Sequence, residues 1–139
     1  MKPQAGLLLL IAVPAMASAS ALAAPREELL AGYAAQAKQD DPGFAGFSTA
    51  RGEAFHHRSF GRGKVDTPAC TSCHADDPRA AGKTPAGKII DPLALSASPS
   101  RYADPAKVRK WFGRNCKDVL GRACTAQEKG DWLSFMVSQ

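Results

Sequence analysis

The chain has 139 residues, of which 45% are hydrophobic, and its formal net charge is +5. This length predicts one small domain with a thin hydrophobic core. The 18 Lys and Arg residues are scattered and are not interleaved with aromatic side chains, which argues against a nucleic-acid-binding protein. Mild basicity of this kind favours either plain solubility or docking to an acidic partner protein.

The first residues have the features of a secretory signal peptide. Lys2 gives a basic start, residues 7–13 form an apolar run, and Ala21-Leu22-Ala23 provides an Ala-x-Ala cleavage site. We therefore expect a signal peptide over residues 1–23, a mature domain over residues 24–139, and export to the periplasm. The apolar run is too short to cross a bilayer, so we expect no stable membrane insertion; a retained N-terminal anchor is the alternative.

Two helices are predicted before the first cysteine. The stretch from Pro25 to about Gln39 is rich in alanine, and proline suits a first helical position. Asp41-Pro42-Gly43 then ends this helix. A second, short helix is expected over Thr49–His57. Within it, Gly52 would either allow another helix to approach closely or end the helix, and the sequence leaves both open.

The run Cys70-Thr71-Ser72-Cys73-His74 has the Cys-x-x-Cys-His pattern of a c-type haem attachment site. Cys70 and Cys73 would bond the two vinyl groups of one porphyrin, because one helical turn separates the thiols suitably. His74 would then coordinate the iron as its proximal axial ligand. We therefore expect one covalent haem c, which would supply part of the core that so short a chain lacks.

Residues 77–102 are rich in Pro, Gly and Ser and show no sustained periodicity. We expect a long loop here, wrapped over the porphyrin edge, with no strand. Within this loop, the carbonyl oxygen of Pro92 is a candidate acceptor for the Nδ1 proton of His74, because an imidazole ligand needs a second partner. The alternative is an ordinary loop proline.

A third helix has clear signals at its start. Asp104 is a suitable N-cap and Pro105 a suitable first residue. Four residues spaced three or four positions apart then form one face, namely Val108, Trp111, Phe112 and Asn115. Asn115 is the polar member of this apolar stripe, and we place it at the end of the helix.

The last helix is expected from Thr125, with Glu128 completing a capping box. Its surface is heavily apolar because it carries Trp132, Leu133, Phe135 and Met136. Together with the haem motif, these helices predict an all-α domain like that of class I cytochromes c, built around one covalent haem. In that arrangement the first core helix crosses the last.

Cys116 and Cys124 are the remaining cysteines. In an exported protein an even pair of this kind predicts a disulfide, which would immobilise the segment beside Asn115. Free thiols and a metal site are the alternatives, although two cysteines with two further histidines make a poor zinc site.

The second axial ligand of the iron decides between functions. A Met or His would give an inert electron carrier, whereas a weakly held ligand would let small molecules bind. Met136 is expected in the core, and His56 and His57 are expected at the surface or in packing, with ligation as their alternative. Asn115 remains, either as a weak neutral oxygen ligand or as a helix C-terminal cap.

Several segments resemble the sphaeroides haem protein family. They are residues 66–74, 81–84, 87–93, 110–116, 121–125 and 128–129. The resemblance covers most of the mature chain, from about Leu29 to Gln139. Its most specific part is Gly113-Arg114-Asn115-Cys116 with the second cysteine at Cys124, whereas the haem motif alone is shared by many cytochromes.

The resemblance implies a monohaem, class I-like cytochrome c with Asn115 as a displaceable distal ligand and a disulfide between Cys116 and Cys124. The reduced haem would then bind dioxygen, nitric oxide or carbon monoxide, and the protein would exchange electrons with a redox partner such as a dihaem cytochrome c. Trp111 or Phe112 would line the distal side. The chain departs from the family at His56, where an aromatic residue is usual.

Three functional classes follow from these expectations. The first is an exported redox haem protein that binds dioxygen or nitric oxide, acting either as a binding protein or as an oxidoreductase. The second is a simple electron-transfer cytochrome c with a sixth ligand that does not leave. The third is a haem sensor or a peroxidase-like enzyme, which would gain support if His56 or His57 lay over the haem.

Overall fold

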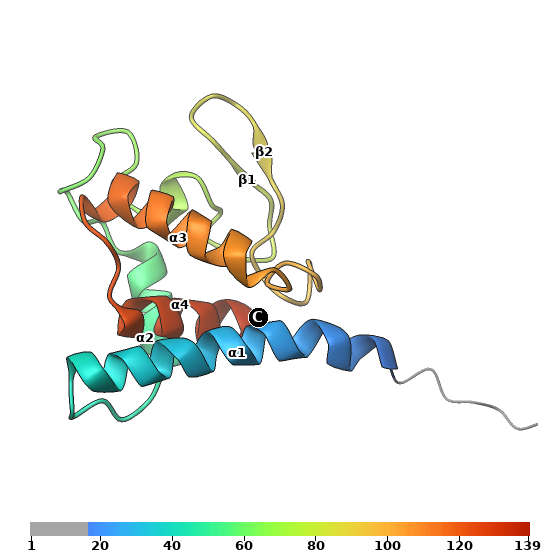
Figure 1. Ribbon diagram of the computed structural model, residues 1–139. Coiled ribbons are helices and arrows are strands. Elements are labelled where there is room, and N and C mark those ends of the chain that lie inside the picture. Colours follow the sequence, from blue (N-terminus) through green and yellow to red (C-terminus); the bar gives the residue numbers. More distant parts are fainter. Residues whose placement is uncertain (1–16) are drawn as a thin grey trace, which may run out of the picture.

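The structure, a computed structural model, describes residues 17–139, with side chains described from Leu22 onward. Residues 17–139 are mostly helical, as predicted, and none of their helices is long and apolar enough to span a membrane. The elements are α1 (Ala17–Asp40), α2 (Thr49–His57), the short 3-10 helix η1 (Cys70–Ser72), β1 (Gly82–Lys83), β2 (Ile89–Ile90), α3 (Pro105–Leu120) and α4 (Ala126–Ser138). In Figure 1, α1 runs beside α4, α2 crosses α4, and α3 lies above this group next to the hairpin.

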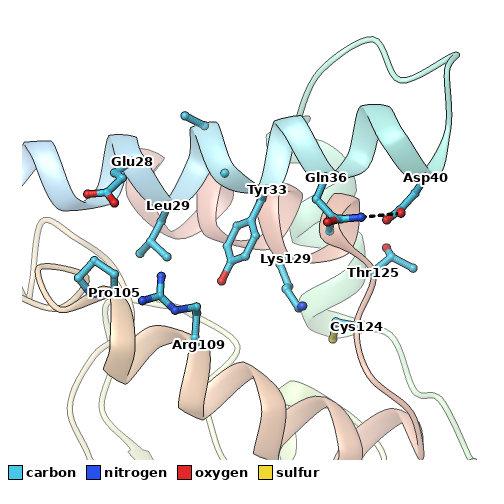
Figure 2. A pocket seen from close by; sticks show the side chains of 13 residues that line it. Glu28, Leu29, Tyr33, Gln36, Asp40, Pro105, Arg109, Cys124, Thr125 and Lys129 are labelled. Atoms are coloured by element: carbon cyan, nitrogen blue, oxygen red, sulfur yellow. Dashed lines mark hydrogen bonds between the residues drawn. The ribbon is translucent and has the colours of Figure 1, made fainter.

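Helix α1 begins earlier than predicted. It starts at Ala17, so Pro25 lies inside the helix and not at its first position. The alanines that precede Pro25 have high helix propensity, which favours the extension despite the missing backbone N–H of proline. The expected cleavage site after Ala23 falls within α1, and residues 1–16 lie outside the described residues, so the signal peptide stays a prediction. A groove separates α1 from α3 and the start of α4 (Figure 2).

The crossing of α2 and α4 depends on Gly52. A Cβ atom at this position would collide with the carbonyl oxygen of Asp131 and with Cβ of Phe135. Only glycine therefore allows the two helix backbones to approach this closely. The predicted close approach is confirmed, and the alternative of a helix-ending glycine is wrong because α2 continues to His57.

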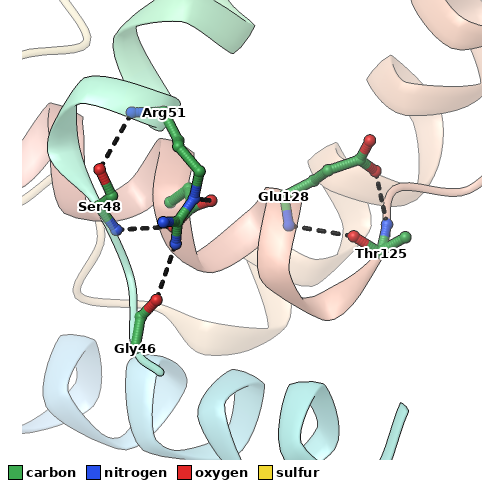
Figure 3. Close-up of polar contacts among 6 residues, drawn as sticks. Gly46, Ser48, Arg51, Thr125 and Glu128 are labelled. Atoms are coloured by element: carbon green, nitrogen blue, oxygen red, sulfur yellow. Dashed lines mark hydrogen bonds and ion pairs between the residues drawn. The ribbon is translucent and has the colours of Figure 1, made fainter. Parts of the chain in front are cut away.

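Polar contacts fix the first turn of α2 on α4 (Figure 3). Arg51 donates from Nε and Nη2 to the two carboxylate oxygens of Asp131, at 2.7 and 2.9 Å. The backbone N–H of Ser48 donates to the same carboxylate at 2.7 Å. Asp131 is buried, and these three charge-assisted hydrogen bonds offset the cost of its burial.

The starts of α3 and α4 are capped as the sequence predicts. The Asp104 carboxylate accepts from the Lys107 N–H at 3.1 Å, and Pro105 is the first residue of α3. Thr125 Oγ1 accepts from the Glu128 N–H at 3.1 Å, while the Glu128 carboxylate accepts from the Thr125 N–H at 2.8 Å (Figure 3). This reciprocal pair is the expected capping box.

The hydrophobic core has two clusters that meet at Trp132. One is formed by Leu29, Leu93, Tyr102, Leu133, Phe135 and Met136, and the other by Phe112, Cys116, Val119, Leu120 and Cys124. The Trp132 ring lies edge-on to Phe112 and to Tyr102, with ring centroids 5.3 and 6.3 Å away. Met136 is fully buried in the first cluster, which confirms it as a core residue.

Residues 77–102 contain one small hairpin that was not expected. Strands β1 and β2 pair antiparallel, with Gly82 opposite Ile90 and Lys83 opposite Ile89. The prediction of no strand was wrong here because two-residue strands are too short to show alternation in the sequence. The rest of the segment is turns and loop, and Tyr102 fixes it by donating from its hydroxyl to the Leu93 carbonyl at 2.7 Å.

Candidate haem site

The haem motif forms one tight helical turn. The N–H of Cys73 and the N–H of His74 both donate to the carbonyl oxygen of Cys70, at 3.2 and 3.0 Å. Cys70 and Cys73 are free thiols, and three-residue spacing in such a turn places both on one side of it. The structure therefore presents two thiols together, followed directly by an imidazole.

The hairpin packs directly on this turn. The N–H of Lys83 donates to the carbonyl oxygen of Cys73 at 2.7 Å. A Cβ atom on Gly82 would collide with that carbonyl oxygen and would lie 2.9 Å from Cα of His74. The close approach of β1 thus holds the backbone of the proximal residue in place.

His56 holds the same segment from the other side. Its ring is fully buried, and its Nδ1 lies 3.3 Å from the indole Nε1 of Trp132, which can only donate. Nδ1 is therefore the acceptor, and Nε2 carries the proton that is donated to the carbonyl oxygen of Ala75 at 3.2 Å. Burial lowers the pKa of His56, which agrees with a neutral ring.

The two histidines of α2 differ in their surroundings. Both ring nitrogens of His56 are occupied by protein partners. His57 is exposed, and its Nδ1 lies 3.6 Å from a carboxylate oxygen of Asp76. Sequence reasoning missed the linking role of His56, although its place at a usually aromatic position was a signal.

His74 has the properties that a metal ligand requires. Burial lowers its pKa to about 4, with the charge of Arg101 adding to the effect. The ring is therefore neutral near pH 7, and a neutral imidazole nitrogen is the form that binds a metal. Within residues 17–139 no side-chain hydrogen bond engages His74, and the predicted contact with the Pro92 carbonyl stays a prediction.

Asn115 lies inside α3 and not at its end. The helix continues to Leu120 and ends at Gly121, whose φ of 70° places it in the left-handed region. The alternative of a helix cap at Asn115 is therefore wrong, because Gly121 fills that role. Asn115 is half-buried, and its amide makes no hydrogen bond within the described part of the chain.

The two aromatic residues that precede Asn115 on α3 differ in exposure. Phe112 is buried and lies edge-on to Tyr33, with ring centroids 6.0 Å apart. Trp111 is 45% exposed, and the guanidinium carbon of Arg114 lies 5.7 Å from its ring centroid. Of the two aromatic residues expected at a distal wall, Trp111 is the one left free of the protein core.

The predicted disulfide between Cys116 and Cys124 is present. Its Cα atoms are 5.5 Å apart, and both residues are buried. The bridge joins α3 to the residue before the N-cap of α4. It therefore fixes the backbone directly beside Asn115.

The loop that leads into the haem motif is tied to the same end of α3. The N–H of Lys64 donates to the carbonyl oxygen of Asp118 at 2.7 Å, and Lys64 Nζ pairs with the Asp118 carboxylate at 2.9 Å. Thr67 Oγ1 also donates to the Asp118 carbonyl, at 3.5 Å. These contacts connect the segment of His74 to the helix of Asn115.

The residues present fit a covalent haem c. Attachment needs two free thiols one turn apart and a neutral imidazole directly after them. Cys70, Cys73 and His74 meet these requirements. Burial raises the pKa of the Cys70 thiol to about 12, so this thiol is protonated near pH 7.

Comparison with known proteins gives consistent results. Residues 42–136 match the family model described as a domain of unknown function, DUF1924. The chain is 46% identical over 112 residues to the cytochrome c-type protein SHP of Cereibacter sphaeroides, covering 81% of this chain and 82% of that protein. It is 32% identical over 114 residues to cytochrome c'' of Methylophilus methylotrophus, covering 81% of this chain and 79% of that protein.

Solved structures of the same two proteins match the fold. Oxidised SHP, described as an oxygen-binding cytochrome c, gives a TM-score of 0.76 over 82% of this chain and 96% of SHP, at 46% identity. Oxidised cytochrome c'' gives a TM-score of 0.73 over 84% of this chain and 95% of the cytochrome c'' chain, at 31% identity. A solution structure of cytochrome c'' is described as giving insights into haem-ligand detachment. It gives a TM-score of 0.71 over 84% of this chain and 94% of the cytochrome c'' chain, at 31% identity.

Proposed function

The chain belongs to the sphaeroides haem protein family of monohaem c-type cytochromes, and from this premise we propose that it binds dioxygen or nitric oxide in its reduced state and exchanges electrons with a partner protein. It carries one covalent haem c, as its relatives do. When bound, the haem supplies a redox-active iron with axial positions for ligands. The remaining steps fall to residues of the chain itself.

The proposed attachment uses the haem motif. Cys70 and Cys73 would hold the porphyrin through thioether bonds, and His74 would be the proximal axial ligand. Its neutral ring and the hydrogen bonds that fix Cys73 and Ala75 on either side support this role. Contacts of this kind would orient His74 towards the iron.

Asn115 is the proposed distal ligand, and its placement carries the proposal. Its amide is half-buried in the middle of α3 without a hydrogen-bond partner within residues 17–139. An amide oxygen is a neutral, hard donor, which binds a ferric centre better than a ferrous one. Asn115 would therefore leave on reduction, and its freed amide N–H would donate a hydrogen bond to a diatomic molecule nearby.

The alternative is a simple electron-transfer cytochrome with a ligand that does not leave. Such a ligand is normally Met or His. From residue 17 onward, the methionine and the two other histidines have different roles: Met136 is in the core, His56 is a buried link, and His57 is at the surface. The descriptions of SHP as oxygen-binding and of cytochrome c'' as showing haem-ligand detachment also favour a displaceable ligand.

The electron partner would dock on the outer side of α3. Lys107, Lys110, Arg114 and Lys117 are exposed and spaced three or four residues apart, and we call them the basic face of α3. Trp111 borders this face through its contact with Arg114. A face of uniform positive charge fits an acidic redox protein, such as an acidic dihaem cytochrome c, and periplasmic export would place the two together.

The test is absorption spectroscopy of the oxidised and reduced protein, with and without carbon monoxide. We expect rapid carbon monoxide binding to the reduced protein, because the distal position is then open. A reduced protein that does not take up carbon monoxide would instead be a simple electron carrier. Consumption of oxygen or nitric oxide by the reduced protein, followed with an electrode, distinguishes an oxidoreductase from a binding protein.

A further inference from the structure

A groove lies between α1 and the α3–α4 end of the molecule (Figure 2), and none of the residues that line it belongs to the haem motif. Its volume is about 780 Å³, which suits a small organic molecule. Helix α3 contributes Pro105 and Arg109, four residues apart on one side of the helix. Every α1 residue that lines the groove follows the expected cleavage site after Ala23, so the mature protein keeps it.

Tyr33 points from α1 into this groove and carries an unsatisfied hydroxyl (Figure 2). The hydroxyl oxygen is buried and has no hydrogen-bond partner among the described residues. Native structures contain few such groups, because each costs free energy when it is removed from water. Burial also raises the pKa of Tyr33, so the phenol is a neutral donor that lacks an acceptor.

Two positive side chains flank this donor. Nζ of Lys129, from α4, lies 5.7 Å from the centroid of the Tyr33 ring. Arg109, from α3, is close enough for its charge to oppose the rise in the Tyr33 pKa. Within residues 17–139 neither cation forms an ion pair. The acidic residues of the groove, Glu28 and Asp40, stand towards its two ends (Figure 2).

The walls beside these polar groups are apolar. Leu29 of α1 and Pro105 of α3 line the groove next to Arg109, and Ala126 lines it near Lys129. A ligand that fits both the polar groups and the apolar walls of the groove has a negatively charged oxygen group and a short hydrocarbon body. This combination excludes a bare inorganic ion as the best match, because such an ion would leave the apolar walls uncovered.

We propose that this groove binds a small organic carboxylate. The carboxylate accepts a hydrogen bond from the Tyr33 hydroxyl and lies between Arg109 and Lys129. The hydrocarbon body lies against Leu29 and Pro105. This site is separate from the proposed haem ligands, and it stands whether or not Asn115 is the distal ligand.

Hexanoate is a suitable probe, with 1-hexanol as its uncharged counterpart. Titration calorimetry on the haem-loaded protein should show saturable hexanoate binding, weakened about tenfold or more by Tyr33→Phe and by Arg109→Gln. Lys38→Gln removes an exposed cation from α1 outside the groove and should leave the affinity unchanged. Absence of saturable binding, equal weakening in Lys38→Gln, or equal binding of 1-hexanol would each overturn the proposal.

A second measurement separates this site from the haem. The Soret band should not change during the titration, because the groove lies away from the proposed iron ligands. A Soret change that follows hexanoate binding and is altered in Asn115→Ala would place the carboxylate at the iron and contradict the groove site. Hexanoate should raise the Tm of the wild type more than that of Tyr33→Phe, and an equal rise in both would also contradict the proposal.

Discussion

His56 donates a hydrogen bond from Nε2 to the carbonyl oxygen of Ala75, at 3.2 Å. Ala75 directly follows the proposed proximal ligand, so a residue of α2 sets the position of the haem motif. Trp132 fixes the tautomer of His56 by donating to Nδ1. A phenylalanine ring at this position could make neither contact.

Replacing His56 should therefore destabilise the fold. His56→Ala removes a fully buried ring and two hydrogen bonds, and we expect a loss of about 2–4 kcal/mol in the free energy of unfolding. Denaturant titration of the haem-loaded protein measures this loss. The control is His57→Ala on the exposed neighbour, which should change stability by less than about 0.5 kcal/mol. Equal effects of the two variants would rule out the linking role.

The same residue should make stability depend on pH. Burial lowers the pKa of folded His56 below its ordinary value of 6.5. Between these two values the unfolded chain binds the proton and the folded protein does not. The contribution of His56 to the free energy of unfolding therefore falls as the pH drops below about 6.5 and is constant above it. The free energy of unfolding of the wild type, minus that of His56→Phe, should therefore become smaller as the pH falls through this range. A difference that stays constant from pH 7.5 to pH 5 would contradict the prediction.

Asn115→Ala should leave the haem attached but change its coordination. Without the amide, the ferric iron should become five-coordinate or water-bound, which absorption and electron paramagnetic resonance spectra detect as a change of spin state. Gly113→Ala is a matched control on the same helix, because nothing lies within 4 Å of the added Cβ. A ferric spectrum of Asn115→Ala identical to that of the control would eliminate Asn115 as the ligand.

The disulfide should matter for stability and for ligand binding. Replacing both partners, as in Cys116→Ser with Cys124→Ser, should cost about 2–3 kcal/mol of unfolding free energy from the short closed loop. The rates of carbon monoxide binding and release should also change, because the backbone beside Asn115 loses its constraint. Stopped-flow measurements on the reduced protein test this. Unchanged rates would show that the bridge only stabilises the fold.

The basic face of α3 should govern the rate of electron exchange. Lys110→Glu with Arg114→Glu should slow the reaction with an acidic cytochrome several-fold at low ionic strength. The difference should disappear near 1 M salt, where charges are screened over about 3 Å. Lys38→Glu with Lys88→Glu makes the same charge change elsewhere on the surface. Equal slowing by both pairs would show that only net charge matters.

The sequence predicted the parts of the structure that local chemistry determines. The caps of α3 and α4 follow from side chains that bond the nearest backbone groups, whereas the sequence left two roles open for Gly52 and the structure decides for close helix approach. The bounds of α2 were also predicted correctly. Such features need only neighbouring residues or a single helix contact, so a pattern in the sequence is enough to reveal them.

Other features depend on contacts between distant segments, and sequence patterns did not predict these features correctly. The sequence places Asn115 at a helix end, whereas Gly121 ends α3 in the structure. The hairpin at Gly82 was missed because its strands are too short for a pattern, and it forms against the carbonyl of Cys73. His56 bonds residues on two other elements, which no local pattern records. Pro25 suits a first helical position, but the alanines before it extend α1 back to Ala17.

The backbone around Asn115 is fastened on the side of Cys116 by a covalent bridge, and at Asp118 by the incoming loop. If Asn115 is the distal ligand, it would leave the metal by rotation about its own side-chain bonds. Rotamer changes take on the order of picoseconds to nanoseconds, whereas helix shifts take microseconds or longer. Reorganisation on electron arrival would thus be confined to one amide, and the surface presented to a partner would be the same before and after the transfer.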